Sequence, residues 1–320
     1  MPWDVHAEVV RAAERLRGHV ALTPARRSAW LSRETGADVW LKLECVQHTG
    51  SFKLRGALNA LLSLTPAERA SGVVAASSGN HGVAVAHGAE ALGARAVVFV
   101  PESVGEARIE PIRQRGAEVV RHGAECGATE AHARAWAAER GMTYLSPYND
   151  ACVVAGQGTV GLELTRQVPG LAAVYVSVGG GGLVGGIGAA VHALDPGLEV
   201  VGCSPDRSPV MQRSVEAGAI LDMPIGETFS ESTAGGIEPD TITFELCRRH
   251  VDRWLMVPEA ELGPTTWRVI EREHVLIEGA AAVAVAAAAA DAGRYRGRPV
   301  AIVLCGANVT RAELDALRDA

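Results

Sequence analysis

The pattern of hydrophobic and polar positions predicts strands and helices in alternation along most of the chain. Apolar runs, or runs that alternate apolar with polar side chains, indicate strands, and apolar residues three or four positions apart indicate helices. Strands are predicted at 39–44, 72–76, 95–100, 118–121, 142–145, 172–178, 198–203, 255–257 and 300–304. Helices are predicted at 5–17, 53–64, 83–92, 109–115, 129–140, 160–167, 183–194, 262–273 and 280–292. This alternation predicts the α/β class, with parallel strands and helices on both faces.

No shift of composition marks a linker between domains. Two sets of alternating strands and helices, residues 46–144 and the remainder, nevertheless predict two lobes with a binding site between them. Residues 204–239 are rich in turn formers and are predicted to be irregular. A short motif, Gln157-Gly158-Thr159, is predicted to precede a helix and to shape a loop near the site.

The amino-acid composition limits the kinds of binding partner that are expected for this protein. The 320 residues are 48% hydrophobic and 21% charged, as in an ordinary soluble globular protein with a sizeable core. With a formal net charge of −7, only 4% aromatic residues and no basic block, a nucleic-acid partner is not expected. The longest apolar run, 279–290, is too short to span a bilayer, and residues 1–18 lack the pattern of a signal peptide, so no membrane partner is expected.

The spacing of the cysteines indicates the cellular compartment in which the protein is expected. They are scattered without CxxC pairs, at Cys45, Cys126, Cys152, Cys203, Cys247 and Cys305. This spacing argues against a zinc site or a disulfide framework and agrees with reduced thiols, so a cytoplasmic protein is expected.

One lysine, Lys53, stands at the predicted entrance of a helix, in the sequence TGSFKLRGA. A helix N-terminus favours an anion, so a lysine held there needs a reason. A lysine with a lowered pKa can attack an aldehyde and thereby hold a carbonyl cofactor. The alternative is a solvated lysine at a helix end, which is the common case for an isolated lysine.

Glycine-rich turns after predicted strands change that balance. In SVGGGGL, residues 177–183, backbone N–H groups could approach an anion closely, and four consecutive glycines carry a large entropy cost, so phosphate binding is favoured over a flexible turn. The turn lacks the GxxxxGK[ST] pattern of nucleotide P-loops, and it lacks a proper GxGxxG with a following acidic residue, which weakens a nicotinamide-binding interpretation. A second turn, SSGNHG at residues 77–82, suits a carboxylate; its alternative role is helix capping.

Together, these three motifs resemble the pyridoxal-phosphate enzymes of the tryptophan-synthase β-like fold, also called fold type II. Within that group the sequence is most similar to the serine/threonine dehydratases, or threonine ammonia-lyases, from about residue 23 to residue 308. The resemblance implies two open parallel-type α/β domains and pyridoxal 5′-phosphate as cofactor. It further implies a small domain at 46–144, carrying the substrate-carboxylate loop, inserted into a large cofactor-binding domain at 1–45 and 145–320.

The resemblance also implies roles for individual residues. Lys53 would form the Schiff base with the cofactor and act as base at the substrate α carbon, and Ser78 matches the serine that acts on the opposite ring face in racemising relatives. The implied cofactor-binding residues are Phe52, Lys53, Asn80, Gly179, Gly180, Gly181, Gly182, Leu183, Glu278 and Cys305. The implied substrate-binding residues are Ser77, Ser78, Gly79, Asn80 and His81.

Four of these residues have more than one interpretation. Cys305, in CGAN after the last strand, would face the pyridine nitrogen, where a thiol does not force protonation and so favours elimination over transamination. The alternative is a buried apolar cysteine, which is common, but the position of Cys305 favours the cofactor role. Glu278 would orient the ring or shuttle protons. Phe52 would lie beside the ring, or belong to the core, and His81 alone would more often be structural.

Two departures from the family pattern shape the expected specificity. Relatives that bind a divalent cation have a glutamate where this chain has the stretch 203–208, and Asp206 alone is a weak ligand set, so no metal is expected. Relatives that handle a side-chain carboxylate keep an arginine in the loop after Gly123, where this chain has Thr129. With the chain ending at Ala320, feedback inhibition by isoleucine is not expected.

The expected function is therefore a pyridoxal-phosphate-dependent lyase that converts L-threonine or L-serine to the 2-oxoacid and ammonia by α,β-elimination. One alternative is a serine racemase-like enzyme, or a dehydratase of a bulkier 3-hydroxy amino acid such as hydroxyaspartate, phenylserine or a hydroxyectoine-derived amino acid. A non-enzymatic alternative is a sensor that binds the cofactor. The expected partners are a small amino-acid substrate and further copies of the chain, in a homodimer or a higher homo-oligomer.

Overall fold

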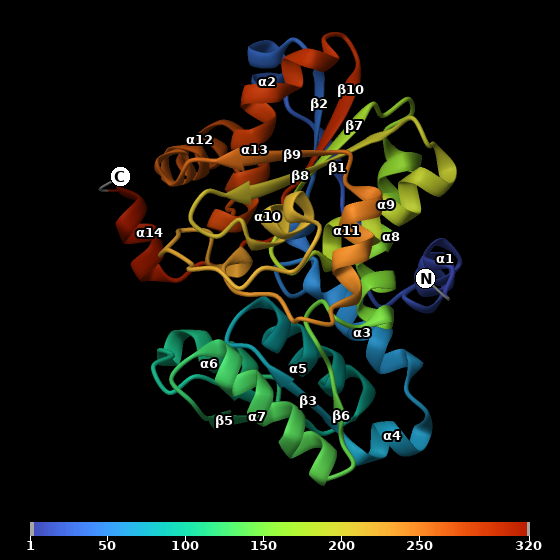
Figure 1. Ribbon diagram of the computed structural model, residues 1–320, viewed down its shortest axis with the longest axis vertical. Helices are drawn as coiled ribbons and strands as arrows, with labels where there is room; N and C mark the ends of the chain where they lie inside the picture. Colours follow the sequence, from blue (N-terminus) through green and yellow to red (C-terminus); the bar gives the residue numbers. More distant parts are fainter. Residues whose placement is uncertain (1–2, 319–320) are drawn as a thin grey trace.

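A six-stranded sheet forms one half of the molecule. The computed structural model describes residues 3–318 and places this sheet in the upper half of Figure 1. Its strands are β1 Ala25–Arg27, β2 Asp38–Lys42, β7 Ala173–Ser177, β8 Glu199–Pro205, β9 Arg253–Val257 and β10 Pro299–Val303. They follow the order β1-β2-β10-β7-β8-β9, and only the edge strand β1 runs antiparallel to its neighbour among the described strands.

A four-stranded parallel sheet forms the other half. Its strands are β3 Val73–Ala76, β4 Ala96–Val100, β5 Glu118–Arg121 and β6 Thr143–Tyr144, in the order β5-β4-β3-β6. The predicted α/β class, with two parallel-type sheets, is confirmed. All four strands lie inside 46–144 and all six strands of the larger sheet lie outside it; the domain boundaries themselves stay a prediction.

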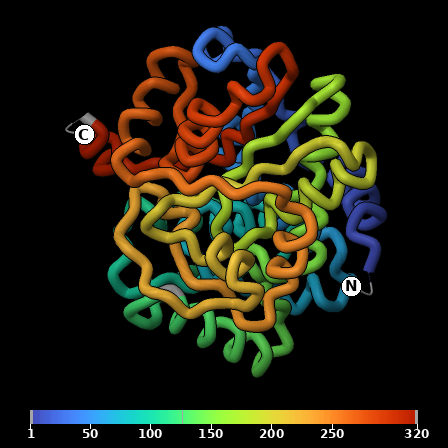
Figure 2. The backbone as a smooth tube through the Cα atoms, turned by 45° about the horizontal axis from the view of Figure 1, so that its top comes forward, coloured from blue at the N-terminus to red at the C-terminus, as the bar shows by residue number. Residues whose placement is uncertain are grey.

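Helices cover both sheets (Figure 1). They are α1 Val5–Arg15, α2 Ala29–Thr35, α3 Lys53–Ser63, α4 Pro66–Ser71, α5 Asn80–Leu92, α6 Glu106–Arg113, α7 Cys126–Glu139, α8 Ala151–Gln167, α9 Gly182–Leu194, α10 Val210–Ala217, α11 Ile242–His250, α12 Leu262–Glu273, α13 Gly279–Asp291 and α14 Arg311–Arg318. Within residues 3–318, no helix is both long and apolar enough to cross a membrane. The two ends of the chain lie on opposite sides of the molecule in both views (Figure 2).

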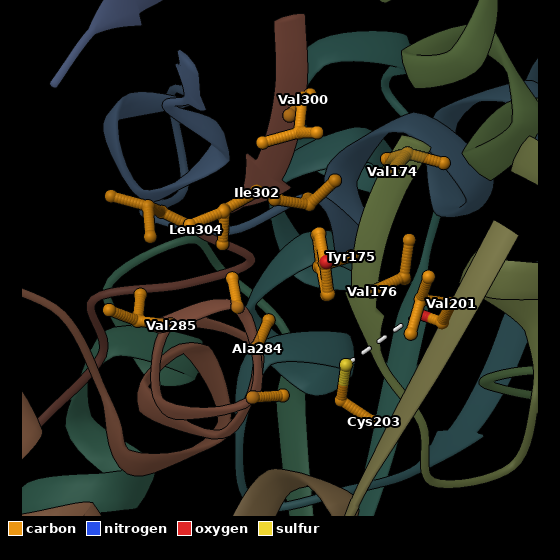
Figure 3. Close-up of a cluster of buried hydrophobic side chains, with 14 of the residues drawn as sticks. Val174, Tyr175, Val176, Val201, Cys203, Ala284, Val285, Val300, Ile302 and Leu304 are labelled. Carbon is orange, nitrogen blue, oxygen red and sulfur yellow. Dashed lines mark hydrogen bonds between the residues drawn. The ribbon is translucent and has the colours of Figure 1, made fainter. Parts of the chain in front are cut away.

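The core of the larger half is built from strands without polar alternation. Every residue of β7 is buried, as expected for a central parallel strand that is covered on both faces. Helix α13 packs against this sheet, and its Ala284 and Val285 belong to the same buried cluster as Val300 and Ile302 of β10 (Figure 3). The helix is apolar around most of its circumference, which is typical of a buried helix.

The prediction that Gln157-Gly158-Thr159 precedes a helix is wrong. These residues lie inside α8, which begins at Ala151, capped by the Asp150 side chain. The glycines of α8 serve helix packing: a Cβ on Gly156 would lie 2.5 Å from the backbone oxygen of Arg55, and one on Gly158 would lie 2.7 Å from that of Gly186. Glycine here therefore marks the close approach of α3 and α9 to α8, not a loop.

Other differences follow from short or weakly patterned elements. The stretch 204–239 is not irregular throughout, because α10 and a 3₁₀ turn at Glu231–Thr233 lie within it. Helix α5 starts at Asn80, three residues before the predicted start at 83, so part of SSGNHG forms its first turn. The predictions omit α2, α4, α11, α14 and β1, most of which are too short for a periodic pattern to develop.

Candidate active site

The main candidate site is a pocket between the two halves, at the carboxyl ends of β7 and β10. In open α/β sheets, ligands bind at this end of the strands. All of the residues predicted to bind the cofactor line it: Phe52, Lys53, Asn80, Gly179–Leu183, Glu278 and Cys305. The space inside is about 40 Å³, far less than the roughly 300–1,000 Å³ of typical small-molecule sites, so a larger ligand requires side chains around the pocket to move.

Lys53 is the one lysine of this pocket. The chain has only two lysines, and the other, Lys42, is fully buried, donating to Glu163, the Thr23 carbonyl and Gln167. Lys53 begins α3, is half-buried, and donates from Nζ to the carbonyl oxygen of Pro147 at 3.0 Å. Desolvation lowers the pKa of its ammonium group to about 8, so far more of the nucleophilic free amine is present near neutral pH than for an ordinary lysine.

The four glycines leave strand β7 and open helix α9. Gly181 has φ +82° and precedes the first helical residue, Gly182. None of the first three glycines has room for a side chain: an added Cβ would lie 2.9 Å from Thr233 at Gly179, 2.4 Å from the Tyr148 ring at Gly180, and 2.6 Å from the sulfur of Cys247 at Gly181. Because the first N–H groups of a helix have no partner within the helix, this turn offers several donors to an anion in the pocket.

Asn80 links the two halves across the pocket. Its Nδ2 donates to both carboxylate oxygens of Glu278 at 2.9 Å and to Ser232 at 3.3 Å, while its Oδ1 accepts a hydrogen bond from Asn308. Asn308 in turn donates to the Thr49 carbonyl at 3.0 Å. These contacts orient the amide of Asn80 and place its donor group toward the pocket.

Glu278 is buried at the start of α13. Burial raises the pKa of its carboxyl group, while the donors Asn80 and Ser232 oppose the shift. Gly306 in the CGAN motif makes room for it, since a Cβ there would lie 2.8 Å from a Glu278 oxygen. The glycine of this motif therefore serves the carboxylate, which sequence reasoning did not anticipate.

Cys305 is buried at the end of β10, and burial raises the pKa of its thiol, so the thiol is neutral. Its carbonyl oxygen accepts the N–H of Phe52 at 3.0 Å, and Gly306 forms a bridge with Ser51. The loop that carries Lys53 is thus fastened to the end of the central strand, although the two segments are about 250 residues apart in sequence.

The predicted substrate loop is only partly in the pocket. Asn80 lines it, whereas Ser77, Ser78, Gly79 and His81 do not. The Ser77 hydroxyl accepts the Gly79 N–H at 3.2 Å, and His81 is buried with Nε2 2.9 Å from the Leu145 carbonyl. Burial lowers the pKa of His81 to about 3, so it is neutral. The substrate-binding and Ser78 roles stay predictions.

Sequence reasoning missed several lining residues. They are Pro147, Tyr148, Val184, Ser232, Thr233 and Ala280; Ser177, which also lines the pocket, already belonged to the SVGGGGL motif. The side chain of Tyr148 packs against Gly180 and Gly182, and its hydroxyl accepts the N–H of Glu238 at 3.0 Å. No local motif marks this residue, and Ser232 with Thr233 fall in the stretch that was predicted to be irregular.

Comparisons with known proteins agree with this geometry. A family model described as pyridoxal-phosphate dependent enzyme matches residues 16–306. A putative threonine dehydratase of Sinorhizobium fredii is 39% identical over 302 residues, covering 94% of this chain and 91% of that protein. An L-threo-3-hydroxyaspartate ammonia-lyase of Pseudomonas sp. is 36% identical over 309 residues, covering 97% of each chain.

The fold comparison leads to the same group. The solved structure of the processed form of threonine deaminase isoform 2 from Solanum lycopersicum superposes with a TM-score of 0.92 at 28% identity, covering 98% of this chain and 86% of that one. A lysine of lowered pKa and a glycine turn that offers N–H donors are the two features expected of a site for a phosphorylated aldehyde. The chain belongs to the family of pyridoxal-phosphate dependent enzymes.

Proposed function

We propose that this enzyme is an ammonia-lyase that converts L-threonine or L-serine to the corresponding 2-oxoacid and ammonia. The observation that carries the proposal is that Lys53, with its pKa lowered to about 8, lines the same small pocket as the N–H groups of the Gly179–Gly182 turn. The likeness to proteins named threonine dehydratase and threonine deaminase supports the reaction class.

The residues of the pocket fit pyridoxal 5′-phosphate, the cofactor of the family. The turn that has no room for side chains would hold the phosphate, Lys53 would hold the carbonyl carbon, and Phe52 and Cys305 would flank the ring. When bound, the cofactor supplies an electron sink for the charge that develops at the substrate α carbon. The neutral thiol of Cys305 provides no carboxylate that would keep a ring nitrogen protonated.

Lys53 would then act as the base. Its amine is largely free of protons at a mildly basic pH, and the Pro147 carbonyl holds its nitrogen in the pocket. Removal of the α proton and loss of the 3-hydroxyl with a proton, as water, gives an enamine. Hydrolysis of the enamine takes the water back, so threonine becomes 2-oxobutanoate and ammonia.

The turn between β3 and α5 would bind the substrate carboxylate. Residues 77–79 precede the first turn of α5, whose N–H groups point out of the helix. Asn80 would contact the cofactor, and Ser78 would serve as an acid or base on the opposite face from Lys53. The contacts of Asn80 with Glu278 and Asn308 hold the amide that this role requires.

A substrate without a second carboxylate is favoured by Thr129. Its side chain is buried and donates to the backbone oxygens of His122 and Glu125, at 2.7 and 2.9 Å. A hydroxyl in that arrangement offers no positive charge to a substrate side chain. Hydroxyaspartate, the substrate in the name of one relative, is therefore the informative competitor in an assay.

We further propose that the enzyme is a cytoplasmic homodimer with a small domain at 46–144. Free thiols at Cys45, Cys152, Cys203, Cys247 and Cys305 support a reducing compartment. The confinement of one whole sheet to 73–144 supports the domain boundary.

The central test is the replacement of Lys53. The Lys53→Ala variant should lose both the visible absorption of bound cofactor and the release of 2-oxoacid from threonine and serine. In the native protein, borohydride reduction followed by peptide mapping should locate the cofactor on Lys53, with Lys42 as the internal control. Cofactor on Lys42, or native turnover by the variant, would disprove the assignment. Faster release from hydroxyaspartate than from threonine would overturn the substrate class alone.

A further inference from the structure

A second cavity lies on the other side of the helix that carries Lys53. It measures about 360 Å³, within the range of small-molecule sites, and opens to solvent beside α1 and α8. None of its lining residues belongs to the candidate active site. Arg55 of α3 reaches this cavity, and because residues two apart on a helix point in different directions, Lys53 reaches the other one.

The cavity has an apolar lining. Leu16 and Leu162 are buried in its wall, whereas Val10 and Leu22, also part of it, are 39% and 70% exposed. Burial of exposed apolar side chains by a ligand is favourable in proportion to the area removed from water. A hydrocarbon group therefore suits this cavity better than a bare inorganic ion.

The charged residues around the cavity favour an anion. Arg17 and Arg166 are exposed, and in the described part of the chain neither guanidinium group has a hydrogen-bond or ion-pair partner. Arg55, by contrast, is saturated by two carboxylates, those of Glu44 and Glu163. The lining holds three arginines, Arg17, Arg55 and Arg166, against two glutamates, Glu14 and Glu163. The cavity therefore keeps one surplus positive charge, in a protein of net charge −7. The arginine fork matches the geometry of a carboxylate.

The cavity is mechanically connected to Lys53. Thr159 and Glu163 of α8 hold the Arg55 guanidinium at 3.1 and 2.6 Å. The backbones of α3 and α8 touch beside it, since a Cβ on Gly156 would meet the Arg55 carbonyl at 2.5 Å. A ligand that contacts α8 and Arg55 and shifts them therefore also shifts the first turn of α3, which begins at Lys53.

We propose that this cavity binds a small aliphatic monocarboxylate. The carboxylate contacts Arg17 and Arg166, the hydrocarbon chain covers Val10 and Leu22, and occupancy changes the surroundings of Lys53. The proposal concerns a site apart from the catalytic pocket, and it holds whatever the enzyme's substrate is.

Titration calorimetry of the holoenzyme with acetate, butanoate and hexanoate tests the site. Each added methylene should tighten binding about fourfold, because each buries a similar apolar area. Hexylamine, which has the same chain with a cationic head, should not bind, and inorganic phosphate should bind more weakly than hexanoate. Equal affinity across the carboxylate series, or binding of hexylamine, would refute the proposal.

Variants locate the binding. Replacing Arg17 and Arg166 together by alanine should weaken hexanoate binding at least tenfold. Arg33→Ala should leave it unchanged, since Arg33 is also exposed and has no partner among the described residues, but lies on α2 away from the cavity. An unchanged affinity in the double variant would refute the proposal.

Two further measurements complete the test. Saturating hexanoate should shift the pH at which the visible absorption of the bound cofactor changes, and no shift would refute the connection to Lys53. Sedimentation velocity of Leu22→Asp should give the native mass. If the variant dissociates to a smaller species and the native protein does not bind hexanoate, a second copy of the chain covers this face and the proposal is wrong.

Discussion

Two turns that each connect a parallel strand to a helix differ in their surroundings. Residues 179–182 follow β7 and residues 77–79 follow β3, and each turn ends a parallel strand and opens a helix with free N–H groups. The first is closed in by Tyr148, Thr233 and Cys247, which leave no room for a Cβ. At Gly79 in the second, a Cβ would meet no atom within 4 Å.

This difference suggests a division of labour. A turn braced on three sides holds its donors in place before a ligand arrives, which favours a group that stays bound through many reactions. An open turn can adjust when a ligand enters, which favours a group that exchanges. We therefore connect the braced turn with the phosphate of the cofactor and the open turn with the carboxylate of the substrate.

The strongest test of the difference between the two turns is to add one methyl group to each of them. Gly180→Ala should weaken cofactor binding about tenfold to a hundredfold, because overpacking against the Tyr148 ring costs roughly 1–3 kcal/mol. Gly79→Ala, the matched control, should keep cofactor affinity within about twofold. Absorbance titration of the apoproteins measures both, and circular dichroism verifies their folding. Equal losses in the two variants would show that the turns do not differ.

The reactivity of Lys53, which lines the same pocket as the braced turn, should depend on pH. Burial lowers the pKa of Lys53 to about 8, so the reactive free amine is lost as pH falls below that value. The rate of cofactor uptake by the apoprotein should rise about tenfold per pH unit below pH ~8 and level off above it. Stopped-flow absorbance measures the rate, with a free lysine derivative as reference. A profile that still rises steeply to pH ~10 would mean that Lys53 is not desolvated.

A smaller effect is expected when the two contacts of Tyr148, the ring beside Gly180 and the hydroxyl beside Glu238, are removed separately. Tyr148→Phe keeps the ring beside Gly180 but removes the acceptor of the Glu238 N–H. We expect a loss of about 1 kcal/mol in the free energy of unfolding, measured in urea, with cofactor affinity unchanged. Tyr148→Ala, which removes the ring as well, should weaken the cofactor further. If Tyr148→Phe alone released the cofactor, the hydroxyl rather than the ring would brace the turn.

The smallest effect is expected at a third turn, after β8. Asp206 there accepts the N–H of Glu259 at 3.1 Å, and among the described residues no three His, Cys, Asp or Glu side chains gather as a metal would require. Treatment with a chelator should therefore leave activity unchanged within error. A large loss that magnesium restores, measured by 2-oxoacid release, would contradict this expectation.

The sequence predicted much of the pocket because its motifs stand at strand ends. Lys53, Asn80 and Cys305 lie far apart in the chain, yet they meet where the start of α3, the first turn of α5 and the end of β10 converge between the two sheets. Tyr148 could not be found in this way, since its contacts with Gly180 and Glu238 join segments that share no pattern. The glycines of α8 misled the prediction for a related reason: a glycine in a loop and a glycine under a neighbouring helix look the same in sequence.

The amino-acid sequence by itself determined the α/β alternation, through its hydrophobic periods, and the presence of a lysine at a helix start and of glycine-rich turns after strands. Tertiary structure decided what those residues can do. Desolvation by burial lowers the pKa of Lys53, and contact with Tyr148, Thr233 and Cys247 leaves a run of glycines no room for side chains. The cavity behind α3 was also a tertiary outcome. Burial and close contact depend on residues that are distant in the chain, and no local pattern records which of them will meet.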